Sequence, residues 1–125
     1  MPTILLVEDE SPGDEVIAMR LRKRGFEVAI ANDGLTGIAM AEANLPDLIL
    51  MDWRMPGIDG LEATKRLKNS ATTTAVPIII LSASVMPSER EQAFAAGCDE
   101  MEEKPVDFVR LTEKINALLN REVNE

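Results

Sequence analysis

The sequence predicts an α/β fold in which a five-stranded parallel sheet carries helices on both faces. Short apolar runs rich in β-branched residues recur along the chain, helix-like segments separate them, and polar side chains follow most of the runs. Short, mainly apolar runs of this kind are typical of strands buried on both faces. Strand–helix alternation implies a parallel sheet with right-handed crossovers.

The apolar runs define four of the expected strands and indicate where the fifth lies. The four are Thr3–Val7, Phe26–Ile30, Asp47–Met51 and Val76–Leu81. The fifth is expected at Asp99–Glu103, where acidic residues dilute the apolar pattern. Such a strand should be short and lie at or near an edge of the sheet.

Capping residues predict where three of the helices begin. Ser11–Asp14 offers an N-cap, a Pro at the first helical position and an acid in the first turn, and Gly25 can end that helix. Asp59 followed three residues later by Glu62 resembles a capping box. Asp107 is the expected cap of the last helix, whose apolar face is made by Phe108, Leu111, Ile115 and Leu118.

Composition excludes several classes of function. The chain has 125 residues, 13 Lys+Arg against 22 Asp+Glu and a net charge of −9, which argues against a nucleic-acid-binding surface. It has no His, which excludes His-based catalysis, His metal ligands and a phosphohistidine of its own. Cys98, the one cysteine, allows neither an internal disulfide nor a zinc site and is expected to be a small buried residue.

The chain shows no targeting or membrane signal. Its start lacks the basic and long apolar regions of a signal peptide, and its apolar runs are far shorter than the ~20 residues of a membrane helix. We therefore expect a cytoplasmic chain with neither nucleic acid nor membrane as a partner. We expect residues 1–125 to form a single domain without an output domain.

Polar side chains follow four of the five expected strands. Glu8 and Asp9 follow the first, Asp52 the third, Ser82 the fourth, and Lys104 the fifth. Because ligands of open α/β sheets bind beyond the carboxyl ends of the strands, these side chains converge if their strands are neighbours. Two carboxylates ~4 Å apart repel by about 4 kcal/mol at an effective dielectric of ~20. A bound cation would keep such a cluster ionised.

The oxygen-only donor set points to a hard cation, Mg²⁺ or Ca²⁺, and few protein ligands beside a lysine favour Mg²⁺. A carboxylate beside Mg²⁺, an ammonium and a hydroxyl can accept a phosphoryl group. Taken singly, the acidic run is more simply a solvated helix cap, Ser82 a structural hydroxyl and Lys104 a surface lysine. Because polar side chains suited to one site follow four separate strands, a shared site is favoured over four unrelated roles.

Five stretches of the chain resemble the receiver domain of two-component response regulators. They are Ile4–Glu10, Leu45–Asp52, Met55–Gly60, Pro77–Ala83, and Gly97–Asp99 leading to Lys104-Pro105. The resemblance covers about residues 3–120 and implies a flavodoxin-like fold with strand order 2-1-3-4-5.

The resemblance implies a phosphorylation switch. Asp52 matches the phosphoacceptor, Lys104 the lysine that pairs with the phosphoryl oxygens, and Ser82 the hydroxyl that moves to them. The Lys104–Pro105 bond is expected to be cis. The implied Mg²⁺ ligands are Asp9, Asp52, Glu8 acting through a water, and the backbone carbonyl of Arg54. The donor would be a phosphohistidine on a histidine kinase or a histidine phosphotransfer protein.

One position departs from the family pattern. Met101 stands where receiver domains usually carry a Tyr or Phe that rotates with the hydroxyl. We therefore expect the signal to pass through the helix at Pro87–Ala96, in which Phe94 is the one large apolar anchor. In the family, a downstream protein binds the face formed by this helix, the fifth strand and the last helix. The residues expected to be exposed there are Arg90, Met101, Glu103 and Arg110.

Other functional classes fit the sequence less well. An aspartyl phosphatase would carry a second acid two residues after its nucleophile, where Arg54 stands here. A flavin carrier would carry a Ser/Thr/Gly loop after the first strand, where this chain has acids. A receiver-like scaffold that works without phosphorylation is the alternative: Met101 favours it, and the intact acids, hydroxyl and lysine argue against it. The sequence thus predicts a phosphotransfer participant rather than a metabolic enzyme.

Overall fold

The computed structural model describes residues 1–9 and 14–123, in which strands and helices alternate strictly. The elements are β1 Thr3–Val7, α1 Asp14–Lys23, β2 Glu27–Ala31, α2 Gly34–Ala43, β3 Leu48–Asp52, α3 Gly60–Lys68, β4 Ile78–Ser82, α4 Pro87–Ala96, β5 Glu100–Glu103 and α5 Phe108–Val123. The cap expected at Ser11 lies outside the described residues. None of the described helices has the length and apolar character that a bilayer crossing requires.

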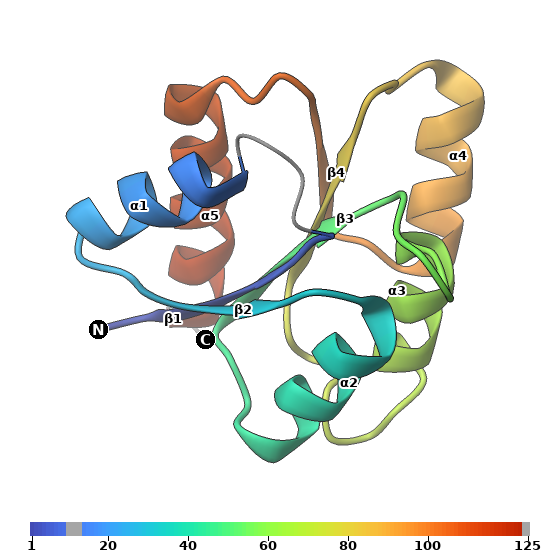
Figure 1. Ribbon diagram of the computed structural model, residues 1–125, viewed down its shortest axis with the longest axis horizontal. Helices are drawn as coiled ribbons and strands as arrows, with labels where there is room; N and C mark the ends of the chain where they lie inside the picture. Colours follow the sequence, from blue (N-terminus) through green and yellow to red (C-terminus); the bar gives the residue numbers. More distant parts are fainter. Residues whose placement is uncertain (10–13, 124–125) are drawn as a thin grey trace.

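The strands form one parallel sheet in the order β2-β1-β3-β4-β5, which confirms the predicted fold class and strand order. Helices α1 and α5 cover one face, and α2, α3 and α4 cover the other (Figure 1). β5 is a four-residue edge strand, as expected. β3 and β4 each end one residue later than predicted, because their ladders continue to Asp52 and Ser82. These two polar residues therefore belong to the sheet itself.

Alternation along the buried strands supplies two separate cores. Val7 and Met51 pack under α2, α3 and α4, whereas Leu6 and Leu50 pack under α1 and α5. Cys98 is buried as expected, and burial raises the pKa of its thiol to about 12. A thiol kept protonated in this way behaves as a small apolar side chain.

Two expectations about the face formed by α4, β5 and α5 are wrong. Met101 is 1% exposed rather than on the surface, because the alternation of β5 turns it into the core beneath α4. Phe94 does not anchor α4: its side chain is 40% exposed, with the Arg90 guanidinium 5.3 Å from the ring centroid. The helix instead buries Ala93 and Ala96. Arg90, Glu103 and Arg110 are exposed, as expected.

Aspartates cap three of the helices. Asp59 Oδ1 accepts a hydrogen bond from the Glu62 amide at 2.9 Å, and Asp107 Oδ1 accepts one from the Arg110 amide at 3.1 Å, so both predicted caps are confirmed. Asp33 caps α2 in the same way, and its bonds to Thr36 lower the pKa of its carboxyl group. These bonds satisfy amides that the first helical turn leaves without a carbonyl.

Side chains cover the open edge of the sheet at β5. The Met101 amide donates to Glu100 Oε1 at 3.0 Å, and the Met101 carbonyl accepts from Lys114 Nζ. An uncovered edge strand is a template for pairing with another chain, and these charged side chains block it. On the α5 side of β5, the Glu102 carboxylate is fully buried between Arg110 and Lys114 and raises the pKa of Arg110.

Thr64→Val is expected to stabilise the protein by about 1 kcal/mol. The Thr64 hydroxyl on α3 is fully buried, and among the described residues it has no hydrogen-bond partner. Replacing such a hydroxyl with a methyl group of similar shape removes a desolvation cost. Thr73→Val is the matched control: this side chain is equally buried, but its hydroxyl donates to the Leu67 carbonyl at 2.6 Å. Urea unfolding should give opposite signs for the two variants, and equal losses would contradict the assignment.

Candidate phosphorylation site

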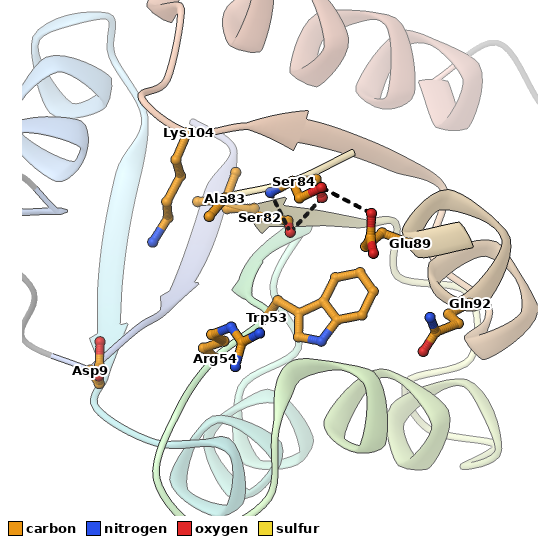
Figure 2. Close-up of a pocket in the computed structure, with 10 residues that line it drawn as sticks. Asp9, Trp53, Arg54, Ser82, Ala83, Ser84, Glu89, Gln92 and Lys104 are labelled. Atoms are coloured by element: carbon orange, nitrogen blue, oxygen red, sulfur yellow. Dashed lines mark hydrogen bonds between the residues drawn. The ribbon is translucent and has the colours of Figure 1, made fainter. Parts of the chain in front are cut away.

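A pocket of about 460 Å³ opens at the carboxyl edge of the sheet, between the loops that follow β3 and β4 (Figure 2). Asp9 and Lys104 lie at one end, Glu89 and Gln92 of α4 lie at the other, and Trp53 and Arg54 lie between them. The remaining lining residues are Leu81, Ser82, Ala83 and Ser84. Side chains from five separate segments therefore meet in one place.

Strand register brings the site residues together. Val7 of β1 lies opposite Met51 of β3, so Glu8 and Asp52 come next on the two neighbouring strands. Asp52 in turn lies opposite Leu81 of β4. The Lys104 amide donates to the Ser82 carbonyl at 2.8 Å and places the lysine where β5 leaves the sheet. The expected cis peptide bond between Lys104 and Pro105 is present.

The start of α3 rests directly on the backbone of Asp52. The Gly60 amide donates to the Trp53 carbonyl at 2.7 Å. A Cβ atom on Gly60 would lie 2.1 Å from the Asp52 carbonyl oxygen, far inside van der Waals contact. Glycine at this position therefore allows α3 to approach the strand end and support it.

The carboxylate that follows β1 and the carboxylate that ends β3 are both buried. The Asp52 side chain is 2% exposed, and Lys104 Nζ lies 2.8 Å from its Oδ1. Glu8 is 3% exposed, so its interpretation as a solvated helix cap is wrong. Burying a carboxylate is costly unless a positive charge lies close by, and the Lys104 ammonium supplies one. Asp9 is partly buried in the pocket wall.

The Ser82 hydroxyl is held by the loop that follows β4. Ser82 Oγ donates to the Ser84 carbonyl at 2.7 Å and accepts from the Ser84 amide at 3.2 Å (Figure 2). The Ser84 hydroxyl donates to Glu89 Oε1 of α4 at 2.9 Å. No motif in the sequence marks Glu89 or Gln92 as site residues, because their place at the pocket depends on how α4 docks.

The donor set suits a hard divalent cation. Asp9 lines the pocket and Asp52 contacts Lys104 beside it, and carboxylate oxygens are the donors that Mg²⁺ prefers; the described lining contains no His or Cys. Within residues 1–9 and 14–123, no three His, Cys, Asp or Glu side chains are grouped closely enough to hold a metal among them. The set expected from the sequence contains two direct carboxylates, with Glu8 acting through water, and does not require such a group.

Fold and site together define a class of protein. The described chain has the doubly wound sheet of a signalling receiver, with acidic residues, a hydroxyl and a lysine at its carboxyl edge. The response regulator receiver domain matches residues 4–116, and the chain belongs to this family. Its fold class and its place in two-component signalling follow from that membership.

Individual relatives support the assignment. The chain is 35% identical to protein PilH of Pseudomonas aeruginosa, over 95% of this chain and 98% of PilH. It is 37% identical to the phosphate regulon transcriptional regulatory protein PhoB of the same organism, over 95% of this chain and 52% of PhoB. The chain thus spans about half the length of several curated relatives it matches.

Solved structures agree with the sequence relatives. A response regulator from Chloroflexus aurantiacus superposes with a TM-score of 0.91 at 31% identity, covering 95% of this chain and 98% of that one. The receiver domain of a sensor histidine kinase from Pseudomonas aeruginosa superposes with a TM-score of 0.88 at 34% identity, with the same coverage. The latter structure has a magnesium ion coordinated in its active-site cleft.

Proposed function

We propose that the chain is a phosphorylation switch in which Asp52 accepts a phosphoryl group from a phosphohistidine. The observation that carries the proposal is the contact between Lys104 Nζ and the buried Asp52 carboxylate, 2.8 Å, at the pocket that Ser82 also lines. A carboxylate presented beside a fixed positive charge is suited to attack phosphorus, because the charge offsets that of the transferring oxygens.

In the proposed step, an Asp52 carboxylate oxygen forms a bond to phosphorus while the bond from phosphorus to the donor imidazole nitrogen breaks. The imidazole leaves with the electron pair and takes up a proton. Lys104 then pairs with a phosphoryl oxygen, and the Ser82 hydroxyl can donate to another. Water later cleaves the phosphorus–oxygen bond and restores Asp52, so the chain resets itself and transforms no metabolite.

Mg²⁺ is the proposed cofactor. Asp9 and Asp52 would bind it directly, Glu8 through a water molecule, and Arg54 through its backbone carbonyl. When bound, the ion supplies positive charge that offsets the oxygens of the phosphoryl group. Its oxygen-only donors and the acidic environment support this choice over a transition metal.

The proposed partners are a histidine kinase or a histidine phosphotransfer protein upstream and a signalling protein downstream. The downstream protein would bind the face formed by α4, β5 and α5, where Arg90, Glu103 and Arg110 are exposed. A scaffold that needs no phosphorylation is the second candidate, because the buried Met101 cannot act as a rotating aromatic switch.

Incubation with a small acyl phosphate and Mg²⁺ tests the proposed function directly. Intact-mass spectrometry should find one added phosphoryl group on the wild-type chain, and removing Mg²⁺ with a chelator should prevent the gain. Asp52→Asn keeps the shape of the side chain but removes the nucleophilic carboxylate, and this variant should gain nothing. An unmodified wild-type chain would favour the scaffold, and an equal gain in Asp52→Asn would place the phosphoryl group elsewhere.

A further inference from the structure

A chain of hydrogen bonds leads from the pocket to the first turn of α4. Ser82 Oγ donates to the Ser84 carbonyl at 2.7 Å, and the Ser84 hydroxyl donates to Glu89 Oε1 at 2.9 Å (Figure 2). Ser84 is therefore bonded through its backbone to a residue of the site and through its side chain to a helix. The other oxygen of the Glu89 carboxylate, Oε2, accepts from the Ser88 hydroxyl at 3.2 Å, so the link to the pocket runs through Oε1 and Ser84 alone.

The start of α4 lacks an ordinary cap and uses Ser84 instead. Met86 occupies the N-cap position, and its side chain makes no capping bond. The Met86 amide instead lies 3.5 Å from Ser84 Oγ, which itself donates to Glu89 in the first turn. In a capping box, the Met86 amide would donate directly to the Glu89 carboxylate. Here the Ser84 hydroxyl lies between these two groups. The first turn of α4 consequently depends on the conformation of the preceding loop.

Helix α4 packs against α3 and β5 through small side chains. The helix buries the small side chains Ala93 and Ala96, and its one aromatic residue, Phe94, is 40% exposed. Side chains this small bury little apolar area and contribute little stabilisation against a shift of the helix, because apolar stabilisation scales with the area buried. A single hydrogen bond at its first turn therefore has a large share in fixing its position.

We propose that Ser84 and Glu89 are positioning residues that hold Ser82 turned toward the loop and release α4 when Ser82 moves to a phosphoryl oxygen. The inference rests on the proposed function and names the link by which that site controls α4. The Ser82 hydroxyl has one proton and cannot donate to the Ser84 carbonyl and to a phosphoryl oxygen at once. The two arrangements are therefore mutually exclusive.

Linkage gives the direction of the effect. A hydrogen bond that is present in the unphosphorylated protein and lost in the phosphorylated one stabilises only the first state. It therefore opposes phosphorylation by the free energy of that bond. Removing the Ser84–Glu89 bond should therefore favour the phosphoryl-bound arrangement and loosen the start of α4. A carboxylate that only stabilised the helix would have no such effect on the pocket.

Four variants separate these possibilities, with beryllofluoride and Mg²⁺ as a stable phosphoryl mimic and backbone-amide NMR as the measure of binding. Glu89→Ala and Ser84→Ala remove the acceptor and the donor, and each should bind the mimic about three- to tenfold more tightly than the wild type. Glu89→Gln keeps an acceptor oxygen and should bind like the wild type. Glu91→Ala removes the same charge from the same helix and should also bind like the wild type; within the described chain Glu91 makes no hydrogen bond or ion pair.

Hydrogen exchange without Mg²⁺ or mimic provides a second readout. The Arg90 amide donates to the Met86 carbonyl at 3.0 Å in the first turn of α4, and it should exchange faster in Glu89→Ala and Ser84→Ala. Glu89→Gln and Glu91→Ala should leave its exchange unchanged. Circular dichroism and thermal unfolding establish that each variant is folded.

The outcomes are distinct. Equal binding of the mimic by Glu89→Ala and Glu89→Gln would overturn the positioning role, as would tighter binding by Glu91→Ala. If the wild type binds the mimic and Ser84→Ala binds it no more tightly, the link is refuted while the proposed function stands. If the wild type does not bind the mimic at all, the proposed function fails and the link fails with it.

Discussion

Gly60→Ala is expected to destabilise the protein by about 3 kcal/mol and to slow phosphorylation of Asp52 by about a hundredfold. In an ordinary helix this substitution stabilises, since alanine has the higher helix propensity. Here the sign reverses, because the new Cβ would lie 2.1 Å from the Asp52 carbonyl oxygen. Neither atom belongs to a flexible side chain, so α3 and the end of β3 must move apart. That movement displaces the proposed nucleophile.

Gly57→Ala is the matched control from the same loop. Gly57 has a φ of +79°, and a Cβ there would meet nothing within 4 Å. The cost should be only the backbone strain of a left-handed alanine, about 1–2 kcal/mol. Urea unfolding measures both stabilities, and the rate of mass gain with an acyl phosphate measures the chemistry. If both variants lose the same stability and keep the wild-type rate of phosphorylation, the close contact between α3 and Asp52 does not affect the chemistry.

The double variant Arg110→Ala/Lys114→Ala should lose about 3–5 kcal/mol of stability. The Glu102 side chain is fully buried, with Arg110 Nη2 3.0 Å from Oε2 and Lys114 Nζ 3.0 Å from Oε1. Removing both cations leaves a buried carboxylate without nearby positive charge, which is far more costly than losing a surface ion pair. Chemical denaturation gives the loss directly.

Two further variants test whether burial is the cause. Glu102→Met replaces the carboxylate with an apolar side chain of similar size and should be neutral or stabilising, because no charge is left buried. Arg66→Ala breaks the exposed pair with Glu62, 3.0 Å within one helix, and should cost at most about 0.5 kcal/mol. A large loss in Glu102→Met would mean that the carboxylate, rather than its charge balance, stabilises the contact between β5 and α5.

Most of the architecture could be predicted from local pattern. Mainly apolar runs marked four strands, of which β1, β3 and β4 are buried, and aspartates at Asp59 and Asp107 marked two helix starts, because both signals depend on neighbouring residues alone. The acids of β5 were harder to interpret. Glu100 and Glu102 dilute the apolar pattern, yet one covers the strand edge and the other lies buried against α5. Their cations, Arg110 and Lys114, come from the following helix, α5.

The exposures of Met101 and Phe94 could not be predicted for a related reason. Both lie in segments whose faces carry mixed polar and apolar residues, so hydropathy does not indicate which side faces the core. The alternation of β5 turns Met101 inward, and the docking of α4 through two alanines leaves Phe94 outside. Glu89 reaches the pocket for the same reason, since the angle at which α4 packs decides which of its side chains faces the site.

The order of elements, the parallel sheet and the placing of acids, a hydroxyl and a lysine after four of the strands were determined by the sequence alone. Each depends on residue type and on the rule that parallel strands end on the same side. Tertiary structure decided which carboxylates are buried, that α3 touches the Asp52 backbone through Gly60, and that Ser84 joins Ser82 to Glu89. These contacts depend on distances between packed elements, which packing of the whole chain sets to within fractions of an ångström.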